Sequence, residues 1–138
     1  MPLADKWKKL YPEKTPVIMI HILKDTDFRP EKIDEALNLA RDFFEKYFSE
    51  HKYDVFICRT WLLYPDTRDI LGPDSNISSF SKRFKIFASN QNTKQALDRI
   101  YGTSDLDAIN KMEKNSSLQK IAYKHLDKLG VAAGLIYK

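Results

Sequence analysis

The sequence predicts a single α/β (α+β) domain in which helices flank a mixed β-sheet of four or five strands. Two apolar strands, Val17–Leu23 and Val55–Leu63, enclose one strongly amphipathic helix that begins at Pro30. Short capped helices and further apolar segments then alternate as far as Tyr137. A chain of 138 residues is long enough for one hydrophobic core, so these elements belong to one layered domain.

The first half of the chain predicts a crossover unit. Residues 17–23 are apolar and rich in β-branched side chains apart from His21, as in a buried strand. A polar loop follows, and then Pro30 suits a first helical position before apolar residues that recur at helical spacing as far as Phe48. The strand Val55–Leu63 comes next. Strands joined in this way are parallel and adjacent.

The middle of the chain is a polar segment that follows the second strand. After two proline-containing breaks, a short helix is predicted over Asn76–Lys82, with Ser75 or Asp74 as its cap. Phe84–Ser89 indicates a third strand. Polar segments at the ends of strands are where α/β proteins usually bind ligands, so we expect a pocket near this region.

Two capping-box patterns organise the last third of the chain. Residues 92–95 are expected to open a helix that Gly102 closes, and residues 116–119 to open another that Gly130 closes. Val131–Tyr137 is then a final strand.

We interpret residues 17–138 as the core and residues 1–16 as an N-terminal amphipathic segment or linker. Residues 1–12 predict a short helix with Trp7, Leu10 and Tyr11 on one side. The N-terminus has no signal-peptide core, no apolar run approaches the ~20 residues of a membrane span, and there is one cysteine. These features indicate a cytoplasmic protein with no membrane partner.

The charge pattern argues against nucleic acid as a partner. The net charge is +4, but the basic residues are spread along the chain among acidic ones, and the densest cluster, residues 82–85, is short. Nucleic-acid binding is therefore the weakest of three functional hypotheses. Three histidines and one cysteine have no metal-site spacing, so no metal is expected.

Two residues are candidates for catalysis. Cys58 lies within the second predicted strand and could act as a nucleophile, with His21 on the neighbouring strand as its base. The alternative is that Cys58 is a buried structural residue, because cysteine is among the most buried residue types.

Four residues are candidates for substrate binding. Ser75 and Asn76, with the amides of the helix that starts there, either bind a polar group of a ligand or simply cap the helix. Arg59 and Trp61 alternate with Cys58 along the strand, which places them together on the opposite face of the sheet. A buried Arg59 would need an acidic partner or a ligand phosphate.

Several phrases of the chain resemble one known family. The sequence is similar to the GNAT-like C-terminal domain of acyltransferase-domain-containing proteins, bacterial proteins in which a helical domain precedes a GNAT-type domain. The similarity extends over roughly residues 17–135, and its specific parts are the Trp-Leu-Leu and Ser-Asn-Ile phrases. The matching segments are Val17–Leu23 with His21, Ala40–Phe44, Cys58 with Trp61–Leu63, Leu71–Ile77, Phe80, Arg83–Phe84 and Ser116–Gln119.

This resemblance implies a GNAT-like mixed α/β fold and transfer of an acyl group from acyl-CoA to an amine. The amine would attack the thioester directly while both substrates are bound, and the protein would position them, accept the amine proton and hydrogen-bond the thioester oxygen. The pocket would lie where the strands from Val17 and Val55 end. Trp61, Ser75 and Asn76 would line it, with His21 and Cys58 nearby.

The leading hypothesis is thus an acyl-CoA-dependent acyltransferase domain, acting alone or as the C-terminal half of a split enzyme with a helical N-terminal domain or partner chain. The alternative is a non-catalytic binding or assembly module, either with a partner chain or as a homo-oligomer. The alternative rests on two features. The loop Lys24–Pro30 has no glycine, although GNAT enzymes usually bind the CoA pyrophosphate with a glycine-containing loop there, and the aromatic N-terminal segment with Trp7, Leu10 and Tyr11 could dock on a partner chain or make a dimer.

Overall fold

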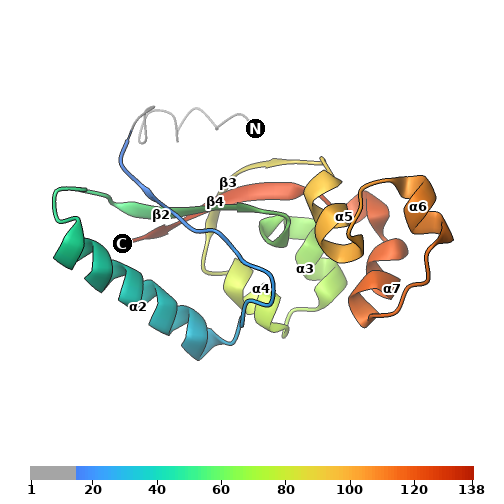
Figure 1. Cartoon of the computed structure of the whole chain (residues 1–138), viewed down its shortest axis with the longest axis horizontal. Helices are drawn as coiled ribbons and strands as arrows, with labels where there is room; N and C mark the ends of the chain where they lie inside the picture. Colours follow the sequence, from blue (N-terminus) through green and yellow to red (C-terminus); the bar gives the residue numbers. More distant parts are fainter. Residues whose placement is uncertain (1–14) are drawn as a thin grey trace.

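The sheet of this protein has four strands in the part of the chain that a computed structural model describes, residues 15–138. The strands are β1 (Ile18–Met19), β2 (Val55–Thr60), β3 (Lys85–Asn90) and β4 (Val131–Tyr137), and their order in the sheet is β1-β2-β4-β3 (Figure 1). β1 is parallel to β2, whereas β2 and β3 are both antiparallel to β4. The predicted mixed sheet and the parallel crossover are confirmed.

Helices cover one side of the sheet and one of its ends. α2 (Pro30–Tyr47), α3 (Pro65–Leu71) and α4 (Asn76–Ser81) lie on one side in Figure 1. Three further helices lie beyond the end of β2. These are α5 (Lys94–Tyr101), α6 (Leu106–Lys111) and α7 (Ser117–Tyr123), followed by the 3-10 turn η2 (Leu126–Lys128).

Buried clusters join the layers, and two of them include residues at the end of β2. Ile33 of α2 packs with Cys58 of β2 and Phe80 of α4, which fixes the helices against the sheet. The second cluster centres on Trp61 and Leu97 and joins the end of β2 to the C-terminal helices. Each fully buried large apolar side chain stabilises the fold by about 1.5–3 kcal/mol relative to an exposed one.

The first strand is much shorter than the predicted Val17–Leu23. The amide of Ile20 still donates to the carbonyl of Ile57 at 2.8 Å, but the chain then leaves the sheet. The Thr26 hydroxyl donates to the carbonyl of Leu23, and Asp25 adopts a left-handed φ of 64°. An apolar run shows that a segment is partly buried but does not show where it stops pairing, and here the unpaired part becomes the wall of a cavity.

The second strand ends at Thr60, not at Leu63 as predicted. The Thr60 hydroxyl accepts a hydrogen bond from the Leu62 amide and caps a 3-10 turn, η1 (Trp61–Leu63). Strand alternation therefore does not extend to Trp61, which is buried in the cluster with the C-terminal helices while Arg59 is exposed. The prediction that Arg59 and Trp61 share a face is wrong for this reason.

α3 was not predicted, although Pro65 occupies its first turn and Asp66 follows, both typical of a helix start. The capping box at residues 116–119 is confirmed, since the Ser116 and Gln119 side chains bond reciprocally to the backbone. The box at residues 92–95 is wrong, because the side chain of Gln95 bonds elsewhere.

The predicted helix over residues 1–12 lies outside the described residues, and the division into residues 1–16 and 17–138 stays a prediction. Within residues 15–138, no helix is long and apolar enough to cross a bilayer. Nor do three metal-ligating side chains come together in this part of the chain.

Candidate active site

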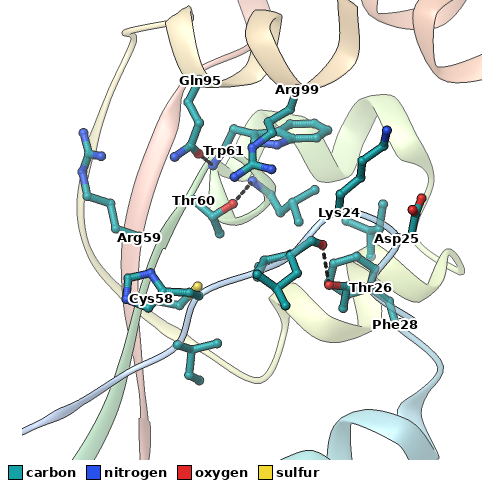
Figure 2. A pocket seen from close by; sticks show the side chains of 16 residues that line it. Lys24, Asp25, Thr26, Phe28, Cys58, Arg59, Thr60, Trp61, Gln95 and Arg99 are labelled. Carbon is teal, nitrogen blue, oxygen red and sulfur yellow. Dashed lines mark hydrogen bonds between the residues drawn. The ribbon is translucent and has the colours of Figure 1, made fainter. Parts of the chain in front are cut away.

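A cavity of about 410 Å³ opens where β1 and β2 separate. The two strands run parallel as far as the Ile20–Ile57 hydrogen bond, and beyond it residues 20–26 and 58–62 form opposite walls. Phe28 and Ile77 also line the cavity. Gln95 and Arg99 reach in from α5 (Figure 2). The place agrees with the prediction of a pocket at the ends of these two strands.

The separation of the strands leaves main-chain groups of β2 without a partner strand. The Ile57 carbonyl accepts from β1, so alternation directs the amide and carbonyl of Arg59 to the same edge. β1 has already left the sheet at that level, and Arg59 lines the cavity. An extended ligand with amide groups can pair there as a short strand would.

The end of β2 is held in place by hydrogen bonds from two helices. The side-chain oxygen of Gln95 accepts the Trp61 amide at 2.7 Å, and the Thr67 hydroxyl donates to the Trp61 carbonyl at 3.2 Å. Both main-chain groups of Trp61 are therefore satisfied within the protein, and Trp61 is itself one of the lining residues. These two bonds tie this part of the wall to α3 and α5.

The cavity lining is positively charged. Lys24, Arg59 and Arg99 line it, and the one carboxylate among the lining residues is that of Asp25. None of the three cations forms an ion pair with a residue in the described range. Because unpaired cations around a concave surface raise the local concentration of anions, the site favours an anionic ligand.

The loop before α2 contains an arginine that is already engaged. Arg29 forms a two-point ion pair with Asp27, with nitrogen–oxygen distances of 2.9 and 2.6 Å. Hydrogen bonds from Arg29 lower the pKa of the Asp27 carboxyl to about 2. Lys24 has no ion-pair partner among residues 15–138, so it is the cation of this loop that a ligand can engage.

The sequence model of the family described as "GNAT-like C-terminal domain" matches residues 4–135, nearly the whole chain. The chain belongs to this family. None of the curated proteins is significantly similar to this GNAT-like domain.

Solved structures with the same fold are acyltransferases. An acyltransferase in complex with decanoyl-CoA superposes with a TM-score of 0.76 at 26% identity, over 88% of this chain and 40% of that one. Complexes with decanoyl-CoA and teicoplanin (TM-score 0.74, 23% identity) and with CoA and 10C-teicoplanin (0.76, 22%) each match 86% of this chain and 40% of theirs. At these lower identities the likeness shows the fold alone. The GNAT-like domain thus spans two fifths of the length of these neighbours.

Four of the predicted site residues lie together in the GNAT-like domain. His21, Cys58, Arg59 and Trp61 all line the cavity. Burial raises the pKa of the Cys58 thiol to about 12, so the thiolate that a nucleophile requires is scarce at neutral pH. This geometry supports the structural interpretation of Cys58 over the nucleophilic one.

Ser75 and Asn76 are not among the residues that line the cavity, although their neighbour Ile77 is. The Ser75 hydroxyl accepts from the Ser78 amide and donates to the Gly72 carbonyl, both at 3.1 Å. These bonds make Ser75 the cap of α4, the simpler of the two interpretations. A role for Ser75 or Asn76 in ligand binding stays a prediction.

Sequence reasoning missed Gln95, Arg99 and Lys24. The spacing of Gln95 and Arg99 places both on one face of a helix, which the sequence shows. Nothing in the sequence indicates that this face meets the end of β2, because the contact joins segments 34 residues apart.

Proposed function

We propose that this GNAT-like domain transfers an acyl group from acyl-CoA to an amine in the cavity between β1 and β2. The observation that carries the proposal is the separation of two parallel strands beside Lys24, a cation with no ion-pair partner among residues 15–138, in a fold shared with acyltransferases that bind acyl-CoA. The volume of about 410 Å³ suits one end of an extended ligand rather than the whole of CoA. We also propose a cytoplasmic location, because acyl-CoA, the proposed donor, is made there.

The donor would bind along the exposed edge of β2. The pantetheine arm contains two amides, and the N–H of one of them can donate to the main-chain carbonyl of Arg59 in place of β1. The phosphates of the donor would lie toward the loop before α2, where Lys24 is the cation that a ligand can engage. Apolar side chains of Ile20, Ile22 and Ile77 would contact the acyl chain.

The chemistry is a direct displacement at the thioester carbon. The nitrogen of the neutral amine forms the new C–N bond, the C–S bond breaks, and CoA leaves as the thiolate. The amide of Arg59 would donate a hydrogen bond to the developing oxyanion. His21, whose imidazole is the commonest type of general base, lines the cavity and would accept the proton released by the amine.

The proposal is tested by calorimetric titration of the full chain with CoA, acetyl-CoA and decanoyl-CoA. We expect binding with micromolar to submillimolar affinity, and Leu23→Trp should abolish it, because Leu23 lines the cavity and is 74% exposed, so a larger side chain there fills the site without disturbing the core. Leu39→Trp, at a 61% exposed position of α2, is the matched control. No heat from any of the three ligands at millimolar concentration would overturn the proposal.

A second candidate function is a non-catalytic module that acts with a partner chain. It is favoured by the glycine-free loop and by apolar side chains exposed on α2 and just beyond it, Leu39, Phe43, Tyr47 and Phe48. This chain matches only 40% of the neighbour's length, so the partner would supply the part of the neighbour that has no counterpart here. The same titration separates the two candidates, since only the acyltransferase requires CoA binding.

A further inference from the structure

A second hollow adjoins the cavity on the far side of β2. It has a volume of about 260 Å³ and is lined by residues of α5, by Asn92 before it, by Arg59 of β2 and by Val131 of β4. Three of its residues, Arg59, Gln95 and Arg99, also line the first cavity. The two hollows therefore meet at these three side chains, which can contact a molecule in either.

The charge of the second hollow comes from two arginines. Lys94 and Asp98 also line this hollow, but they form an ion pair at 2.7 Å, so their charges cancel. Arg59 and Arg99 remain without an ionic partner in the described part of the chain. Gln95 uses its oxygen to accept the Trp61 amide, so it presents only its NH₂ group, a donor. The junction of the hollows is therefore rich in donors and positively charged.

The side chain of Arg59 lies away from the loop that contains Lys24. Cys58 packs into the layer of α2 and α4, so strand alternation sends the Arg59 side chain to the opposite face of the sheet. Figure 2 shows Arg59 and Lys24 on opposite sides of the cavity, with Arg99 descending from α5 between them. A donor whose phosphates lie near Lys24 leaves Arg59 available for another ligand, and Arg99 can contact that ligand because it also lines the second hollow.

We propose that the second hollow is the acceptor site and that it selects a small amine bearing a carboxylate, such as an amino acid. This inference rests on the proposed acyltransferase function. The guanidinium groups of Arg59 and Arg99 bind the carboxylate by charge-assisted hydrogen bonds. The amine of the same molecule then points through the junction toward the thioester carbon, where its nitrogen forms the new C–N bond as the C–S bond of the donor breaks. A hollow of about 260 Å³ suits a molecule of amino-acid size.

The test compares α-amino acids with the matching α-amino amides as acceptors, using acetyl-CoA and decanoyl-CoA as donors. The amides keep the amine and lose the negative charge. We expect kcat/KM at least about tenfold higher for the acids, as charged hydrogen bonds give. Arg59→Gln and Arg99→Gln should each raise KM for the acids by about tenfold or more and change KM for the amides little. Lys111→Gln on α6, outside both hollows, is the matched control for loss of one positive charge.

Calorimetry with CoA on the same variants separates the outcomes. Unchanged CoA affinity in Arg59→Gln and Arg99→Gln, together with loss of acid preference, supports the inference. Three results would overturn the inference and leave the acyltransferase function standing. The wild-type protein could use acids and amides equally, it could use neither while still binding CoA, or the variants could bind CoA more weakly. A wild-type protein that binds no CoA overturns both.

Discussion

The side-chain oxygen of Gln95 accepts the main-chain amide of Trp61 at 2.7 Å and so joins α5 to the end of β2. The bond stands where a further strand pairing would have satisfied this amide. It fixes the position of the cavity wall and also brings Arg99, one turn along α5, to the same site. One contact thus links the stability of the fold to the composition of the site.

Gln95→Leu is expected to destabilise the protein by about 1–3 kcal/mol, because it leaves the amide of buried Trp61 without an acceptor. Gln95→Glu keeps an oxygen at this place and should recover most of the loss. Urea unfolding measures the difference, with Gln91→Leu in the exposed preceding loop as control. Equal stability of Gln95→Leu and the control would show that the bond contributes nothing.

Gly130→Ala is expected to cost more than about 2 kcal/mol, since the new methyl would lie 2.6 Å from the carbonyl oxygen of Asn90 and 2.5 Å from the ring of Tyr64. Gly102→Ala is the comparison. Gly102 has a φ of +79° but open space around it, so only backbone strain of about 1–2 kcal/mol applies there. Thermal unfolding of both variants shows which one loses more stability. A smaller loss of stability for Gly130→Ala than for Gly102→Ala would contradict the close packing around Gly130.

The stability of the fold should fall at alkaline pH because of Cys58. Burial raises the pKa of its thiol from 9.0 to about 12, so the unfolded chain ionises first. The contribution is complete below pH 9 and is lost as the pH rises toward 12, at up to about 1.4 kcal/mol per pH unit. Cys58→Ala should remove this part of the pH dependence of stability and leave the part that comes from the other titratable groups. Parallel curves of unfolding free energy against pH for the two proteins would refute the burial argument.

The indole of Trp61 is expected to report ligand binding. The chain has two tryptophans, so Trp7→Phe leaves Trp61 as the single emitter. Because Trp61 lines the cavity, titration with decanoyl-CoA should change its emission with the same midpoint that calorimetry gives. Leu23→Trp would add a second emitter, so the blocking control is Leu23→Glu, which places a negative charge in the cavity against the anionic ligand. Binding by calorimetry without any change in emission would place the ligand outside this cavity.

Local patterns predicted much of the fold. The crossover from β1 through α2 to β2 follows from two apolar runs around an amphipathic helix, and the parallel pairing follows from the connection. The Ser116 capping box was recognisable because all its bonds lie within four residues. By contrast, the pattern at residues 92–95 was misleading, because Gln95 found a tertiary partner that competes with capping.

The amino-acid sequence by itself determined the class of the domain, its family, and the presence of polar and reactive residues in the segment that begins at Cys58. Only the tertiary structure decided which of them form a site. It buried Cys58, made Ser75 a helix cap, and brought Lys24, Gln95 and Arg99 to the ends of two strands. The physical reason is that periodicity and capping depend on neighbours along the chain, whereas the separation of β1 from β2 and the docking of α5 depend on packing between residues far apart in it.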